Sequence, residues 1–178
     1  FTRNVDWKNN ETLYIHDVEI APNSAKANLG AGEAYFHLAI DSLRPPSEAQ
    51  KLAYFKKGLT YFDKALEIYP DYNDPYLRKI VTYIFMDDFE NAARFIPYSR
   101  RLYPTNEKLL KYQKVVSGHY FNQAVAERKA YFTLLGAHNI PEADEHLRRA
   151  VDLIQQKVLP VYDAEMEYYG ELGNLYGQ

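Results

Sequence analysis

The chain contains no cysteine, which excludes disulfides, thiolate zinc sites and cysteine nucleophiles. It also has no apolar run of the roughly 18 residues that a membrane-spanning helix requires. Its 21 lysines and arginines are outnumbered by 24 aspartates and glutamates and form no basic stripe. The electrostatic attraction that dominates nucleic-acid affinity is therefore missing. We expect neither nucleic-acid binding nor membrane insertion by this segment.

Motifs that carry catalysis or metal binding are also missing. The histidines are His16, His37, His119, His138 and His146, and no two of them have a metal-ligand spacing. No glycine-rich phosphate loop and no Gly-x-Ser-x-Gly motif occurs. One group of carboxylates comprises Asp163, Glu165, Glu167 and Glu171. Because this group falls in a predicted helix rather than in a sharply turning calcium loop, we expect a solvated helix face. The sequence predicts no catalytic residue, no metal and no cofactor.

Tyrosine is abundant, with 17 residues among 178, whereas tryptophan occurs once. A tyrosine ring suits a half-buried seam between helices as well as a contact surface, because its body is apolar and its tip polar. This composition leaves open a helical domain that binds a small molecule or a sugar. Such a domain predicts a closed aromatic pocket with converging polar groups.

Helical periodicity dominates the chain, and one pattern returns at a fixed spacing. Between Gly58 and Pro70, small or apolar residues follow a helical stripe that a proline ends. The same Tyr-Pro ending returns at Pro104, 34 residues after Pro70. Pro22 precedes Pro70 by 48 residues, and the polar stretch 42–48 accounts for the excess as a loop.

This pattern resembles the tetratricopeptide repeat (TPR). The matching packing positions of the second helices are Gly58, Phe62, Ala65 and Pro70, and then Ala92, Ile96, Ser99 and Pro104. A weaker match to the second-helix pattern comprises Ala143, Leu147 and Ala150. The matching positions of the first helices are Gly32 and Tyr35, and then Tyr76 and Tyr83, with Ile80 where the family has a small residue. The resemblance implies an all-α fold, a right-handed α-α superhelix with divergent C-terminal capping helices.

The expected organisation is a single domain with four parts. Residues 1–22 form an N-terminal segment with a half-repeat helix, and 23–70 form the first repeat with a loop insertion near 42–49. The second repeat covers 71–104, and divergent TPR-like helices with a cap cover 105–178. Within this last part we expect helices over 107–118, 121–135, 142–158 and 164–176.

The family resemblance implies a concave groove that binds a protein or peptide. The groove positions carry Leu29, Glu33, Phe36 and His37 in the first repeat, and Leu77, Val81 and Ile84 in the second. One TPR subgroup holds acidic chaperone tails with a Lys and Asn clamp, but those places hold Leu29 and Glu33 here. We therefore do not expect a chaperone tail as the partner. A groove filled by the chain's own segment 121–135 remains an equal alternative.

The N-terminal stretch suggests a wider context. Arg3-Asn4, Trp7 and Thr12-Leu13, followed by 21–27, resemble the junction before the C-terminal TPR tail of multi-pass bacterial membrane proteins. Many of these are glycosyltransferases of the protein O-mannosyltransferase type. The resemblance implies a fragment of a longer, membrane-anchored protein, located on the periplasmic or other extracytoplasmic side, with the catalytic residues elsewhere. The alternative for the whole chain is a free-standing TPR adaptor, for which a cytoplasmic location is also open. The alternative for Trp7 is plain core packing.

Overall fold

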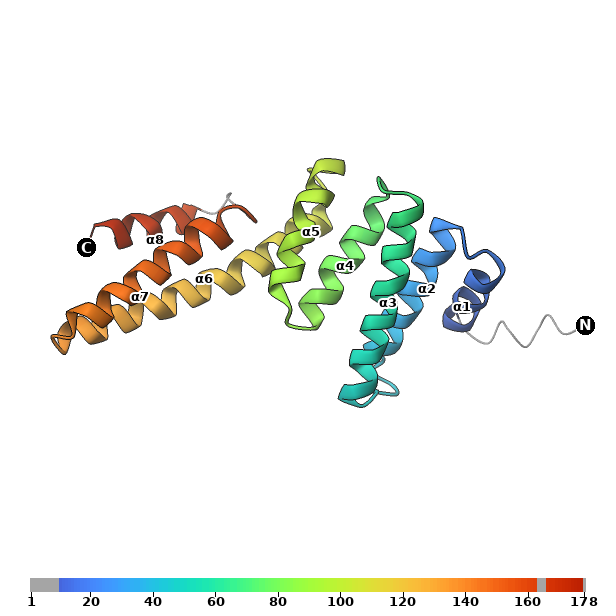
Figure 1. Cartoon of the computed structure of the whole chain (residues 1–178), viewed down its shortest axis with the longest axis horizontal. Coiled ribbons are helices and arrows are strands. Elements are labelled where there is room, and N and C mark those ends of the chain that lie inside the picture. Colours follow the sequence, from blue (N-terminus) through green and yellow to red (C-terminus); the bar gives the residue numbers. More distant parts are fainter. Residues whose placement is uncertain (1–9, 163–165, 178) are drawn as a thin grey trace, which may run out of the picture. The chain divides into compact units, whose positions relative to one another are not determined.

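The computed structural model describes residues 10–162 and 166–177, and the secondary structure of these residues is entirely helical (Figure 1). The helices are α1 (Asn10–Ile20), α2 (Ala25–Ala39), α3 (Glu48–Ile68), α4 (Asn73–Phe85), α5 (Phe89–Leu102), α6 (Glu107–Gly136), α7 (Ile140–Asp152), the π-helical segment η1 (Leu153–Val158) and α8 (Met166–Tyr176). The all-α prediction is confirmed. The chain forms two compact units, Phe1–Asn106 and Glu107–Gln178.

The first unit is built from helix pairs that follow one another along the chain. α2 packs against α3 and α4 packs against α5, as Figure 1 shows. α1 packs on α2, and α2 also contacts α4, so the first helices of the two pairs are neighbours. This succession of pairs is the arrangement that a TPR-like sequence predicts.

Side-chain caps explain where several of these helices begin. Ser24 caps α2 by accepting a hydrogen bond from the backbone N–H of Ala27 at 3.2 Å. α3 begins with a capping box in which Ser47 and Gln50 each bind the other's backbone N–H. Asp88 caps α5 through the N–H of Asn91 at 3.1 Å. Each cap satisfies backbone donors that a helix start leaves without a partner.

The second helix of each pair ends in the same way. α3 ends at Ile68 and α5 at Leu102, and the next residue in both cases is an extended tyrosine followed by proline. Tyr69 has φ −138° and Tyr103 φ −145°, which takes the backbone out of the helix before the proline. The helix ends predicted from the 34-residue spacing are therefore confirmed.

The predicted insertion near 42–49 is a loop up to Ser47, after which α3 begins. Within it, the Asp41 carboxylate accepts the backbone N–H groups of Leu43 and Arg44 at 2.9 and 3.1 Å. These hydrogen bonds, helped by the Arg44 charge, lower the pKa of Asp41. The loop thus has local structure of its own.

The seam between α2 and α3 depends on close backbone approach. Phe62 and Ala65 are fully buried, and a Cβ atom added to Gly32 would lie 2.4 Å from the Phe62 ring. A Cβ on Gly58 would lie 3.1 Å from the carbonyl oxygen of Gly32. Glycine is required at Gly32 because a methyl group there would overlap the ring.

The other residues that match the repeat pattern lie mainly in the helix seams and the turns. Ala92, Ile96 and Ser99 on α5 are fully buried, Tyr76 on α4 is 8% exposed, and Tyr35 and Tyr83 are half-buried. Pro70 and Pro104 lie exposed in the turns. Ile80, at the place of a small residue, is also fully buried.

One repeated aromatic contact was not predicted. Tyr35 on α2 stacks on Tyr61 on α3, with ring centroids 5.7 Å apart and planes 9° apart. Tyr83 on α4 stacks on Phe95 on α5 in the same way, at 5.8 Å and 1°. Tyr61 and Phe95 are 34 residues apart, so each helix pair carries the same stack. Parallel offset stacks of this kind add to the energy of area burial.

The second unit corrects the helices expected after Pro104. The segments 107–118 and 121–135 form one helix of 30 residues, α6. Gly118 lies inside it, and an isolated helical glycine costs only about 1 kcal/mol, which tertiary packing offsets. The buried residues Gln113, Val116 and Ser117, and then Tyr120, Phe121 and Ala124, continue one stripe across the glycine.

The helix expected over 142–158 is α7 continued by η1, before Pro160 in the following turn. Ala143 and Ala150 of α7 are fully buried, and Leu147 packs beside Ala150, Ile154 and Leu175. Buried hydrogen bonds tie α6 to the C-terminal part. Gln113 donates to the carbonyl of Val161 at 2.9 Å, and the hydroxyls of Ser117 and Tyr168 lie 3.1 Å apart.

The expectation of a solvated carboxylate face was wrong for Glu171. Its side chain is only 9% exposed and pairs with Arg128 on α6, Nε to Oε1 2.9 Å. A buried carboxylate requires such a partner, because desolvation of an unpaired charge is costly. Asp163 and Glu165 lie outside the described residues, as does the side chain of Glu167.

Candidate partner-binding surface

Most of the predicted groove residues are buried within the first unit. Leu29, Phe36, Leu77 and Val81 are each at most 9% exposed. The Phe36 ring packs against Phe55 and Phe85, with centroids 5.8 and 5.5 Å away. Leu29 belongs to a cluster with Leu59 and Phe62. These side chains offer little surface to a partner, and their role in binding stays a prediction.

The other three predicted groove residues keep contact with solvent. His37 is exposed, and Glu33 and Ile84 are half-buried. The Glu33 carboxylate pairs with the guanidinium of Arg78 at 2.5 Å, which joins α2 to α4. The alternative in which residues 121–135 fill the groove concerns the second unit and stays a prediction.

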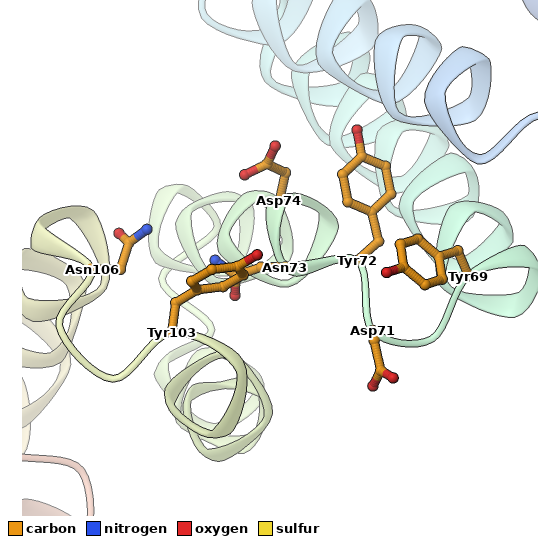
Figure 2. Close-up of a pocket in the computed structure, with 7 residues that line it drawn as sticks. All are labelled: Tyr69, Asp71, Tyr72, Asn73, Asp74, Tyr103 and Asn106. Carbon is orange, nitrogen blue, oxygen red and sulfur yellow. The ribbon is translucent and has the colours of Figure 1, made fainter.

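A pocket lies where two turns of the first unit meet, those that follow α3 and α5 (Figure 2). Its volume is about 320 Å³. It is lined by Tyr69, Asp71, Tyr72, Asn73, Asp74, Tyr103 and Asn106. We call this set the turn pocket. None of its residues was among the predicted binding residues.

The repeat itself produces the turn pocket. Tyr69 and Tyr103 occupy the same position after their helices, 34 residues apart, and are 54% and 57% exposed. Figure 2 shows Tyr103 across the pocket from Tyr69 and Tyr72. The Tyr69 and Tyr72 rings are neighbours, with centroids 5.9 Å apart. The Tyr-Pro pairs at both helix ends were the sequence signal that could have pointed to this site.

Asn73 supplies a buried amide to the turn pocket. Its side chain lines the pocket although the residue is only 6% exposed. Its Oδ1 accepts a hydrogen bond from the Ser99 hydroxyl at 2.7 Å, which anchors the amide to α5. Its Nδ2 has no acceptor among the described residues and is not fully buried, so it can donate toward the pocket.

The turn between α3 and α4 is held by a hydrogen bond from a side chain to the backbone. The hydroxyl of Tyr76 donates to the carbonyl of Pro70 at 3.0 Å. Tyr76 also stacks on Tyr98 of α5, with centroids 5.5 Å apart. The Pro70 carbonyl is therefore tied to α4, and Tyr76 in turn connects α4 to α5.

The turn pocket is electrostatically negative. Asp71 and Asp74 lie on opposite sides of the turn in Figure 2, and no lysine, arginine or histidine lines the pocket. Asp71 lies 3.6 Å from the Arg101 guanidinium, whereas Asp74 forms no ion pair with a described residue. Burial and then the charges of Asp74 and Glu33 raise the pKa of Tyr72. The start of α4 contributes only about half a positive charge, less than one carboxylate.

In the described part of the chain, no three His, Cys, Asp or Glu side chains are grouped as metal ligands. Over the same residues, no helix has the length and apolar character to span a bilayer. The turn pocket opens widely to solvent, which counts against the closed aromatic pocket that a sugar-binding domain predicts.

Comparison with known proteins gives matches among solved structures. No protein-family model matches the chain, and no curated protein matches it. Among solved structures it is similar to a thermophilic TPR protein of Thermus thermophilus, with a TM-score of 0.49 and 12% sequence identity. The match covers 93% of this chain and 70% of the other. At this identity it says nothing of function, and the TPR-like arrangement rests on the helix pairs described above.

Proposed function

We propose that this chain is a non-catalytic scaffold that binds another protein. The observation that carries the proposal is the turn pocket. Successive helix pairs are sealed at their seams by small residues, while their turns present exposed tyrosines and carboxylates around an open pocket. Tyrosine is enriched where proteins meet, because its ring adds contact area and its hydroxyl adds hydrogen bonds.

The proposed context is the extracytoplasmic tail of a larger bacterial membrane protein, such as a glycosyltransferase. Its support is the sequence resemblance of residues 3–14 and 21–27 to the junction before such tails. Residues 1–9, including Trp7, lie outside the described residues. In this context the tail holds an acceptor protein or a partner near a catalytic site that the membrane part supplies. The sequence encoded upstream of Phe1 tests it: a dozen hydrophobic spans support the proposal, and a start codon or signal peptide there contradicts it.

The scaffold proposal is tested by site-specific photo-crosslinking in the native cells. A photoreactive phenylalanine analogue replaces Tyr103 at the turn pocket or His37 on α2, both of which are exposed. Thr60, exposed on α3, is the control position. We expect a single crosslinked product, with one defined partner mass, when the analogue is at Tyr103 or at His37. We expect no product when it is at Thr60. Equal crosslinking from all three positions, or none at all, contradicts the proposal.

A further inference from the structure

The turn pocket combines three features that specify a ligand. The Tyr69 and Tyr103 rings are more than half exposed and lie at equivalent places of two repeats. A carboxylate without an ion-pair partner among the described residues, Asp74, stands at the rim. The largely buried Asn73 lines the pocket, and its Nδ2 reaches solvent without an acceptor among the described residues. A ligand that satisfies all three has a flat cationic group and a hydrogen-bond acceptor.

From these features we infer that the turn pocket receives an arginine side chain of the partner protein, with a backbone carbonyl of that partner bound to Asn73. This inference rests on the scaffold function proposed above and names the chemistry of its partner. The guanidinium stacks on the exposed tyrosine faces and pairs with Asp74. The solvent-accessible Asn73 Nδ2 group donates to the carbonyl.

Charge distinguishes this ligand from a neutral one. A neutral sugar could also stack on tyrosine rings and accept from Asn73. It would, however, cover the Asp74 carboxylate and remove water from it without supplying a compensating charge, which is unfavourable. Lysine would supply the charge but not the planar, delocalised group that stacks on rings and meets a carboxylate with two parallel hydrogen bonds.

The chain's own arginine supports this assignment. The Arg101 guanidinium lies 3.6 Å from Asp71, and both side chains are about two-thirds exposed. A guanidinium thus already approaches one side of the pocket, but loosely and in contact with solvent. Asp74, on the other side of the turn, has no such partner among the described residues. Arg101 partly neutralises the negative charge that would attract an incoming arginine. Removal of Arg101 should therefore strengthen binding.

The test uses short peptides and the full 178-residue chain. An acetylated, amidated Gly-Arg-Gly peptide is titrated while backbone amide NMR signals are followed. A matched Gly-citrulline-Gly peptide has nearly the same shape without the charge, and a mannose disaccharide tests the sugar alternative. We expect the arginine peptide to shift signals of residues 69–74 and 103–106, and the other two probes to bind markedly more weakly. Equal binding of the citrulline peptide, or binding of the disaccharide alone, overturns the inference.

Two charge variants should change the affinity for the arginine peptide in opposite directions, and a third variant is the control. Asp74→Asn should weaken the arginine peptide about two- to fivefold, as expected for loss of an exposed ion pair. Arg101→Gln should strengthen it by a similar factor of about two to five. Glu48→Gln removes an exposed charge at the opposite end of α3 and should change nothing. Because all three residues are exposed and contribute only through the helix dipole or an exposed ion pair, the thermal melts should change little. An unchanged affinity in Asp74→Asn, or a weaker one in Arg101→Gln, contradicts the assignment.

The two proposals fail in different ways. If Tyr103 crosslinks a partner in cells but the arginine peptide does not bind, the scaffold stands and the arginine inference falls. If the peptide binds but neither Tyr103 nor His37 crosslinks a partner, the pocket holds a cation and the scaffold proposal falls. Loss of the Tyr103 adduct in the Asp74→Asn variant, with the fold intact, supports both.

Discussion

The ammonium group of Lys79 lies 3.8 Å from the centroid of the Phe95 ring and pairs at the same time with the carboxylate of Asp63. Lys79 is on α4, Phe95 on α5 and Asp63 on α3, so one charge joins both helix pairs. The Lys79 side chain is only 6% exposed, whereas that of Asp63 is 60% exposed. A desolvated cation over an aromatic face is a favourable contact, provided that the charge is also paired.

Replacing Asp63 should therefore destabilise the first unit. Asp63→Asn leaves a buried ammonium without its counter-charge, and we expect a loss of about 1–3 kcal/mol, because the unpaired group keeps its desolvation cost. Urea unfolding followed by circular dichroism measures the change.

Lys79→Met is the matched control. It removes the buried charge and keeps an apolar chain over the Phe95 ring, while Asp63 stays hydrated. We expect its stability to lie within about 1 kcal/mol of wild type, because apolar replacement of a buried charge is often neutral. A large loss in Lys79→Met together with no loss in Asp63→Asn would show that the ion pair does not have this role.

Gly32→Ala should weaken the α2–α3 seam. The new methyl group would lie 2.4 Å from the Phe62 ring, which is fully buried and cannot move away freely. Overpacking of this kind costs about 1–3 kcal/mol, which exceeds the gain of about 1 kcal/mol in helix propensity. We expect a lower thermal midpoint.

Gly118→Ala provides the comparison. No atom lies within 4 Å of the position that its Cβ would take, and Gly118 is inside α6. Here only the propensity gain applies, so we expect a stabilisation of about 0.5–1 kcal/mol. If Gly32→Ala raises the thermal midpoint as Gly118→Ala does, the close approach at Gly32 is not limiting.

Phe36→Asp should unfold the first unit rather than remove a binding surface. Phe36 is 5% exposed and packs against Phe55 and Phe85, so we expect a loss of at least about 3 kcal/mol. The neighbouring variant His37→Asp, at an exposed position, should stay within about 0.5 kcal/mol of wild type. A thermal melt of Phe36→Asp equal to that of wild type would instead support the prediction that Phe36 lines the groove.

The first unit should lose stability at alkaline pH. Burial is the main cause that raises the pKa of Tyr35, Tyr72, Tyr76 and Tyr83 above 10.0, and nearby carboxylates add to it for Tyr72 and Tyr83. The folded state thus favours the neutral phenol. This contribution is fully present below the unfolded pKa and is lost as pH rises through the raised pKa values.

Urea midpoints between about pH 8 and about pH 11 measure this loss. Tyr83→Phe should reduce its size, because Asp63 and Asp88 no longer oppose a phenolate at that position. At about pH 8 the phenols are neutral, so the urea midpoint of Tyr83→Phe reports only the change in packing. The comparison with higher pH then isolates the effect of ionisation. A midpoint that rises with pH in this range would refute the sign.

The helical class and the helix ends of the first unit followed from local chemistry. Caps such as Ser24 and Ser47 and the Tyr-Pro endings at Pro70 and Pro104 act within a few residues, so a sequence displays them directly. The 34-residue spacing followed for the same reason, because small residues and prolines recur wherever one helix pair repeats another.

Contacts between distant residues decided the rest. Gly118 sits in the middle of one long helix because packing along α6 outweighs a small local cost, and local patterns do not reveal that balance. Phe36 is buried because Phe55 and Phe85, on two other helices, cover its ring.

The turn pocket shows the same division. Tyr69 and Tyr103 were visible as a repeated Tyr-Pro pair, but their meeting around Asn73 was not. Asn73 becomes an anchored amide only because Ser99, 26 residues away, reaches it from another helix. The sequence by itself thus determined which segments are helical and how often they repeat. The tertiary structure decided which side chains those helices bury and which they leave for a partner. Burial depends on residues that are close in space but distant in sequence, and the order of residues does not reveal them.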